Sequence, residues 1–154
     1  MKCYSIWLLL MGMLVTGVRG QQEFVSVDES AIRVVRSDDG WIAGIPFHIR
    51  KPYHIQEVSG AQENVIPTSI SFEKSQHFEI VKHEFTSLKY DTVYLDHVPS
   101  RVLSDTFEVS VFLKFPPGHS EGIPSLKGGL VYQACNDRQC FFPRTLEFNI
   151  PLKK

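Results

Sequence analysis

Cysteine is scarce in this chain, and this scarcity limits the chemistry that the protein can perform. Only three cysteines occur among 154 residues, and they are Cys3, Cys135 and Cys140. A structural zinc site uses four ligands, and none of the six histidines lies at metal-ligand spacing from another histidine or from a cysteine. We therefore expect no metal site and no metal cofactor.

Signatures of hydrolysis and of nucleic-acid binding are also missing. The sequence has no Gly-x-Ser-x-Gly motif, and no histidine is marked as the partner of a nucleophilic cysteine. Lys2 and Arg19 are the only charged residues among the first 20, so the rest of the chain carries 14 basic and 17 acidic residues, a formal net charge of −3. Because no basic cluster could neutralise a run of phosphates, nucleic acid is not expected as a partner.

A long apolar run occurs only at the start of the chain. Residues 4–15 form an apolar core after Lys2, and the small residues Val18 and Gly20 precede Gln21. This pattern predicts a secretory signal peptide over residues 1–20 and a mature domain over residues 21–154. A retained membrane anchor is the less favoured alternative, because the run is shorter than the roughly 20 residues of a spanning helix. The mature chain is expected to have no membrane span.

Apolar spacing of the helical kind is absent, and the chain instead consists of short strand-like runs between turns. The clearest run is 106–115, in which Phe107 and every second residue up to Phe115 are apolar and would share one face. The other predicted strands are 24–27, 31–35, 41–45 (with Pro46 ending or edging it), 68–72, 78–81, 126–134 and 145–150. This pattern predicts an all-β protein, an antiparallel β-sandwich of immunoglobulin type.

Three further segments connect or border the predicted strands. Asp38 and Asp39 precede Gly40, and we interpret them as a hairpin turn in preference to an acid–base pair. Residues 57–64 are polar and predict a loop. Residues 85–98 have weak periodicity, so they are either an edge strand or a long functional loop. The sequence leaves this last choice open.

Cys135 and Cys140 lie on the connection between the last two predicted strands. Such a pair can form a disulfide if the turn brings the Cα atoms within about 4.4 to 6.8 Å, and an oxidising compartment would favour the bond. The closed loop is short, so the bond adds less stability than a bridge across a long loop. Residue patterns alone leave both a redox couple and an inert structural disulfide open.

The residues around the two cysteines resemble a known family. The run Tyr132-Gln133-Ala134-Cys135, followed by Cys140-Phe141-Phe142-Pro143, resembles the amino-terminal periplasmic domain of thiol:disulfide interchange proteins of the DsbD family. Weaker similarities at 53–55, 66–73 and 89–91 extend the resemblance over most of the mature chain. It implies an immunoglobulin-like sandwich in the periplasm. It also implies a cofactor-free, oxidoreductase-type exchange that passes electrons from a thioredoxin-like donor to oxidised periplasmic proteins.

The same resemblance implies roles for individual residues. Cys135 and Cys140 would be the redox couple, and Cys140 would form the mixed disulfides with partners. Some family members shield the couple with an aromatic-bearing cap loop, for which residues 85–94 are the candidate. The expected shielding or docking residues are Tyr132, Phe141, Phe142 and Tyr90.

Three departures from the family pattern qualify these expectations. Four residues separate the cysteines, where the best-known member has five, and Phe142 stands where many relatives have a proline. No membrane domain or thioredoxin-like domain follows the predicted sandwich, so the electron donor is expected to act in trans. The competing hypothesis is a non-enzymatic binding module of the cell envelope whose disulfide only ties a turn.

Overall fold

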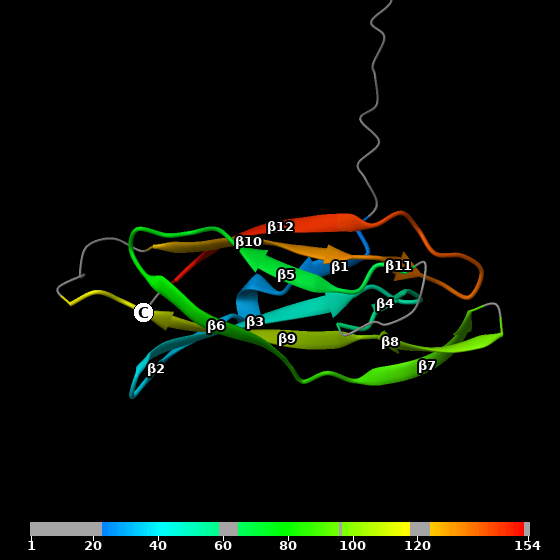
Figure 1. The fold of residues 1–154 in the computed structure, drawn as a ribbon, viewed down its shortest axis with the longest axis horizontal. Coiled ribbons are helices and arrows are strands. Elements are labelled where there is room, and N and C mark those ends of the chain that lie inside the picture. The colour runs from blue at the N-terminus through cyan, green and yellow to red at the C-terminus, as the bar shows by residue number, and fades with distance from the viewer. Residues whose placement is uncertain (1–22, 59–64, 96, 118–123, 153–154) are drawn as a thin grey trace, which may run out of the picture.

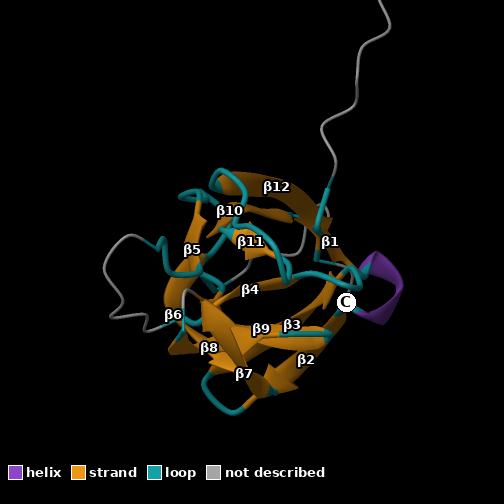
Figure 2. Ribbon diagram, turned by 90° about the vertical axis from the view of Figure 1, so that its right-hand side faces the viewer, coloured by secondary structure: helices purple, strands orange, loops and turns teal. Residues whose placement is uncertain are grey.

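The computed structural model describes residues 23–58, 65–95, 97–117 and 124–152. The predicted signal peptide and most of the predicted 57–64 loop lie outside these residues. The described chain is almost entirely antiparallel β-structure, with one 3₁₀ turn at Glu29–Ala31 (Figures 1 and 2). The strands are β1 (Val25–Val27), β2 (Arg33–Ser37), β3 (Gly40–Ile49), β4 (His54–Gln56), β5 (Ser69–Phe72), β6 (Glu79–Thr86), β7 (Tyr90–Leu95), β8 (Val98–Leu103), β9 (Thr106–Lys114), β10 (Ser125–Tyr132), β11 (Ala134–Cys135) and β12 (Arg144–Pro151).

A five-stranded sheet forms one layer of the molecule. Its order is β1-β3-β9-β6, and β2 also pairs with β3. The alternation predicted for residues 106–115 is confirmed in β9, where the inward side chains are buried and the intervening ones are not. The buried residues of this face are Phe107, Val109, Val111 and Leu113.

A second, three-stranded sheet has the order β12-β10-β5 and lies over the first (Figure 1). The two layers share one apolar core: the ring of Phe47 stacks on Phe107 at a centroid distance of 5.0 Å, and contacts Phe148 of β12 edge-on at 6.0 Å. The predicted immunoglobulin-like β-sandwich is confirmed. Among the described residues, no helix is long and apolar enough to cross a membrane.

The strand that Pro46 was predicted to end or edge continues to Ile49, so its predicted end at residue 45 was wrong. Pro46 stands at the position where β2 has ended and β1 begins to pair with β3. The Asp28 N–H donates to Pro46 O at 2.9 Å, and Asp28 O, which an N–H at position 46 would otherwise contact, accepts from Ala31 N at 3.1 Å. The missing proline donor therefore leaves no acceptor unpaired.

The turn at Asp38 and Asp39 is confirmed as the two-residue connection of the β2–β3 hairpin, in which Ser37 pairs with Gly40. Gly40 has φ 153°, and a Cβ there would lie 2.4 Å from the carbonyl oxygen of Leu113. A side chain at position 40 would thus collide with β9. Both aspartates are exposed, which agrees with a role as turn residues.

In the segment 85–98, left open between strand and loop, the described residues include the end of β6, all of β7 and the first residue of β8. β7 is the edge strand of a third sheet with the order β11-β4-β8-β7. This sheet lies at the end of the molecule that carries the cysteine connection, on the right of Figure 1. The candidate cap segment, residues 85–94, therefore consists of the end of β6, residues 87–89 and most of β7, and its shielding role stays a prediction.

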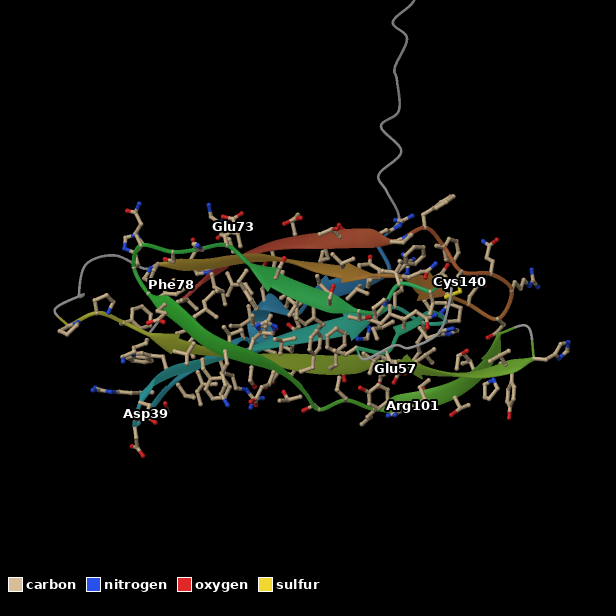
Figure 3. The ribbon with its side chains drawn as sticks, in the orientation of Figure 1. Asp39, Glu57, Glu73, Phe78, Arg101 and Cys140 are labelled. Carbon is tan, nitrogen blue, oxygen red and sulfur yellow. A yellow bond between two sulfur atoms is a disulfide. The ribbon has the colours of Figure 1, made fainter. Side chains whose placement is uncertain are left out.

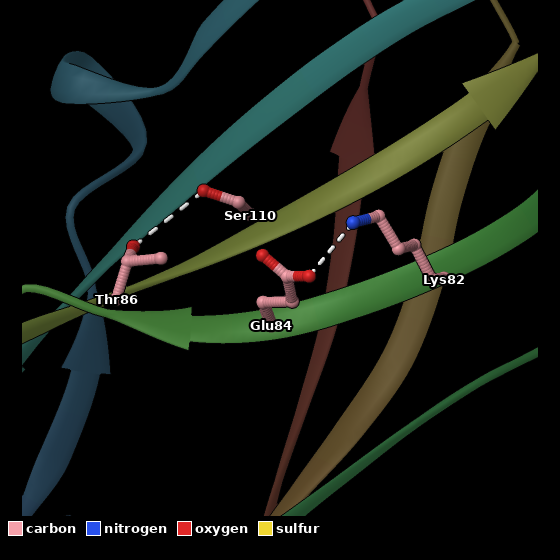
Figure 4. A network of polar contacts seen from close by, with 4 residues as sticks. All are labelled: Lys82, Glu84, Thr86 and Ser110. Carbon is pink, nitrogen blue, oxygen red and sulfur yellow. Dashed lines mark hydrogen bonds and ion pairs between the residues drawn. The ribbon is translucent and has the colours of Figure 1, made fainter.

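The outward face of the five-stranded sheet carries polar contacts (Figure 4). Lys82 Nζ lies 2.8 Å from Glu84 Oε1, and Thr86 Oγ1 lies 3.5 Å from Ser110 Oγ. Exposed ion pairs of this kind contribute about 0 to 1 kcal/mol. The stability of this layer therefore comes from its inward, apolar face.

Candidate functional site: the Cys135–Cys140 hairpin

Cys135 and Cys140 form a disulfide at one end of the sandwich, with an S–S distance of 2.02 Å (Figure 3). The two residues lie opposite each other in an isolated antiparallel bridge. The hydrogen bonds on either side run from Phe141 N to Ala134 O (2.8 Å) and from Asn136 N to Gln139 O (2.9 Å). This is the close, non-hydrogen-bonded pair of an antiparallel ladder, so the Cα atoms are only 4.0 Å apart, just below the predicted range.

The tip of the hairpin is built by Asn136. Its Oδ1 accepts hydrogen bonds from Arg138 N and Gln139 N, both at 3.0 Å. An asparagine that bonds its own following backbone in this way forms an Asx turn. The turn reverses the chain within four residues and holds the second cysteine over the first.

The two cysteines differ in exposure. Cys135 is 0% exposed, whereas Cys140 is exposed to solvent. Cys140 is therefore the cysteine that a thiolate of another protein could approach from solvent, whereas Cys135 is closed to it. The couple has one accessible side and one protected side.

Gln133 clamps the hairpin to the body of the sandwich. Its Oε1 accepts from Ile66 N at 2.9 Å, and its Nε2 donates to Phe141 O at 3.1 Å. Gln133 was predicted only as a member of the motif, without a role of its own. Its position two residues before Cys135 was the available signal in the sequence.

The two phenylalanines after Cys140 lie in different environments. Phe141 is half-buried and packs on Phe24 and Tyr53, at centroid distances of 4.7 and 5.8 Å. Phe142 is 89% exposed. A shallow cavity of about 410 Å³ lies beside the exposed sulfur, lined by Gln133, Gln139, Cys140, Phe141, Phe142, Pro143 and Arg144.

Of the two tyrosines predicted for the site, Tyr132 lies in the core beneath the hairpin and Tyr90 lies on another strand of the four-stranded sheet. Tyr132 is buried in the core at the end of β10, where burial raises the pKa of its phenol against hydrogen bonds to the Phe24 and Val25 backbone. Tyr90 lies on β7, and the strands β4 and β8 separate β7 from β11, which carries Cys135. Its ring is covered by the Arg101 guanidinium at 4.2 Å. The structure does not bring Tyr90 to the sulfurs.

Two residues that the sequence analysis did not select do lie at the couple. Gln56 Nε2 donates a hydrogen bond to Cys135 Sγ at 3.3 Å, and His54 is the cross-strand partner of Cys135. Both are buried. Nothing local marks them, because their positions depend on the register between β4 and β11, which are far apart in the sequence.

Among the described residues, no group of three or more His, Cys, Asp or Glu side chains could hold a metal ion. The buried polar side chains next to Cys135 are the amide of Gln56 and the imidazole of His54. What this arrangement can do chemically is to exchange its disulfide through the accessible sulfur.

No family model and no curated protein matches the sequence, but solved structures with a similar fold exist. The N-terminal periplasmic domain of ScsB from Proteus mirabilis aligns with a TM-score of 0.55 and 10% identity, over 79% of this chain and 44% of that chain. The present chain therefore spans less than half of that protein chain. The DsbD N-terminal domain of Neisseria meningitidis, in the reduced form, aligns with a TM-score of 0.42 and 17% identity, over 80% of this chain and 86% of that one. The chain has the fold of the ScsB domain, and the predicted likeness to a DsbD-type amino-terminal domain is confirmed at the level of the fold.

Proposed function

We propose that this chain is an exported thiol-disulfide exchange domain. Its Cys135–Cys140 couple would pass electrons between a thioredoxin-like donor acting in trans and oxidised periplasmic proteins. The observation that carries the proposal is a disulfide in a tight hairpin between an exposed cysteine, Cys140, and a fully buried one, Cys135. The fold shared with a periplasmic domain supports it. A signal peptide over residues 1–20 and a mature domain over residues 21–154 are part of the same proposal.

The exchange needs no cofactor. A donor thiolate attacks Cys140 Sγ, the S–S bond breaks, and Cys135 Sγ leaves with the electron pair, so that a mixed disulfide joins Cys140 to the donor. The second thiol of the donor then attacks the donor sulfur of that bond and releases Cys140. The domain has gained two electrons, which it passes to an oxidised protein by the reverse sequence of attacks.

The surface around Cys140 offers a docking site for such partners. Phe142 projects beside the shallow cavity, while Phe141 holds the same segment against the aromatic rings of Phe24 and Tyr53. An exposed aromatic side chain next to a reactive sulfur supplies apolar contact area at little conformational cost. We assign partner docking to Phe142, and assign to Phe141 and Tyr132 the task of holding the hairpin from behind.

The reduction potential of the couple tests the proposal. The mature domain is equilibrated in glutathione buffers, and alkylated thiols are counted by mass spectrometry. A potential of roughly −180 to −270 mV is the range of exchange proteins. A potential below roughly −300 mV is typical of structural disulfides, and it would replace the exchange function with the binding module.

Single-cysteine variants test which sulfur is attacked. A thioredoxin whose resolving cysteine has been removed serves as the probe. Cys135→Ser leaves the exposed thiol, and this variant is expected to be trapped in a mixed disulfide with the probe after activation. Cys140→Ser leaves only the buried thiol and is expected to give little adduct. Equal trapping by the two variants would contradict the assignment of Cys140.

A further inference from the structure

The buried sulfur of the couple lies on a face of the four-stranded sheet that also carries two buried polar side chains. Cys135 pairs with His54, and Ala134 pairs with Ile55. Because side chains alternate along a strand and opposite residues share a face, Cys135, His54 and Gln56 lie on one face, while Ala134 and Ile55 point into the core. The exposed fractions of the three polar-face residues are 0%, 5% and 2%.

Gln56 is held so that its amide contacts the sulfur. Its side-chain Nε2 donates to Cys135 Sγ at 3.3 Å. Its backbone carbonyl oxygen accepts from Thr68 Oγ1 at 2.6 Å, and its backbone N–H donates to Gln133 O at 3.3 Å. A disulfide sulfur is a weak acceptor, whereas a thiolate is a charged and much stronger one. The amide is thus positioned in advance for the charge that appears when the S–S bond opens.

His54 supplies an independent observation. Its Nε2 atom is buried and has no hydrogen-bond partner among the residues that the structure describes. Buried polar atoms are nearly always paired, and an exception calls for a specific explanation. Cβ atoms of directly opposite residues lie about 4.5 to 5.5 Å apart, so the ring and the cross-strand sulfur start from neighbouring positions on one face of the sheet. In the disulfide this sulfur has no proton to share, but in the dithiol it has one.

The imidazole of His54 has a protonation state that suits a proton acceptor. Burial holds the pKa of His54 below its ordinary value of 6.5, while the charges of Asp137, on the hairpin, and Asp91, on β7, act in the opposite direction. A neutral imidazole can accept a proton, and a positioned imidazole is the commonest general base in proteins.

We propose that His54 is the proton acceptor for Cys135 and that Gln56 stabilises the resulting thiolate, so that these two residues drive the step in which Cys135 resolves a mixed disulfide. This inference rests on the proposed exchange function and deepens it. The Cys135 S–H proton passes to His54 Nε2, and the thiolate attacks Cys140 Sγ. The Cys135–Cys140 bond forms, the mixed disulfide breaks, and the partner leaves as a thiolate that takes a proton from water. Two electrons pass to the partner.

The resolving step can be measured without a protein partner. Reduced full-length mature protein reacts with Ellman's reagent in two phases: the Cys140 thiolate first releases one thionitrobenzoate, and Cys135 then attacks the mixed disulfide and releases the second. For His54→Gln we expect an unchanged first phase and a second phase slowed about 100-fold at pH 7, which is the usual contribution of a positioned base. Gln56→Met, which keeps the length but removes the N–H groups, should also slow only the second phase.

The matched control is His48→Gln, because His48 is exposed on β3, outside the sheet that holds the couple. This variant should keep both phases and their pH profiles. A second phase in folded His54→Gln with the wild-type rate and pH profile would overturn the proposal.

A measurement on the wild-type protein covers the case in which His54→Gln does not fold. The titration of the His54 ring nitrogens is followed by NMR in the oxidised and the reduced protein. We expect different midpoints, since only the reduced protein offers a thiol to Nε2, and identical midpoints would overturn the proposal. Failure of the exchange function is distinguishable, because it would appear as a reduction potential below roughly −300 mV whatever the second phase shows.

Discussion

In the five-stranded sheet, every inward side chain of β9 from Phe107 to Leu113 is apolar and buried. The four-stranded sheet instead buries an imidazole, an amide and a sulfur on one face. Burial of apolar area stabilises a fold, whereas burial of polar groups costs free energy unless each finds a partner. Among the described residues, polar burial is therefore concentrated in and beside the sheet that holds the disulfide.

The largest effect on stability should come from a substitution in the apolar core between the two layers. Phe47 is 1% exposed and contacts rings of both layers. We expect Phe47→Ala to lower the free energy of unfolding by about 3 to 5 kcal/mol, because it removes a fully buried ring and leaves a cavity. Urea unfolding of the oxidised protein measures this change. A loss below about 1 kcal/mol would show that the two layers do not depend on a shared core.

Reduction of the disulfide should have a smaller effect on stability. The cysteines are separated by five positions in the sequence, and a loop this short gives about 2 kcal/mol in the chain-entropy model. Urea unfolding of oxidised and reduced protein at the same pH gives the difference. If reduction cost as much as Phe47→Ala, the disulfide would be a structural brace and the contrast between the two sheets would fail.

The pH dependence of stability should reveal the buried imidazole. Because the pKa of His54 in the folded chain lies below 6.5, the unfolded chain binds the proton more readily. The stability due to neutral His54 is therefore present above pH 6.5 and is lost as the pH falls through the folded pKa. We expect His54→Gln to flatten the decline that wild-type oxidised protein shows in urea unfolding below pH 6.5, while His48→Gln keeps it. Equal slopes for wild type and His54→Gln would contradict this.

The smallest change in stability is expected at the exposed aromatic of the site. Phe142 is 89% exposed, so Phe142→Ala should change the free energy of unfolding by no more than about 0.5 kcal/mol. The same variant should slow exchange with a thioredoxin-like protein but not with the small Ellman's reagent. Equal slowing with both reagents would place the effect in the sulfur chemistry and not in docking.

Local pattern was enough to predict much of the sandwich. The alternation in residues 106–115, the Asp-Gly turn and the apolar runs on both sides of the cysteines are signals contained within a few residues. The continuation of β3 through Pro46 was not predictable in this way, because it depends on which neighbouring strands pair on that side. Likewise, residues 85–95 became strands through pairing with β8 and β9, which weak local periodicity does not show.

The residues of the candidate site also fall into those that the local sequence predicts and those that depend on strand pairing. The cysteines and the exposed Phe142 could be selected from the motif alone. His54 and Gln56 could not, because Gln56 contacts a sulfur 79 positions away, through a register of only two residue pairs between β4 and β11. Sequence reasoning located the reacting atoms but not the groups that surround the buried one.

The clamp made by Gln133 has a consequence for communication between the domain and its partners. The hairpin is held by the bonds from Phe141 N to Ala134 O and from Gln133 Nε2 to Phe141 O, neither of which involves sulfur. Because these bonds do not depend on the disulfide, we expect them to persist when it opens and the oxidised and reduced domains to have nearly the same surface shape. Under the proposed function, a redox partner would then bind both forms alike, and the reaction at the sulfurs, not the binding step, would distinguish the oxidised from the reduced domain.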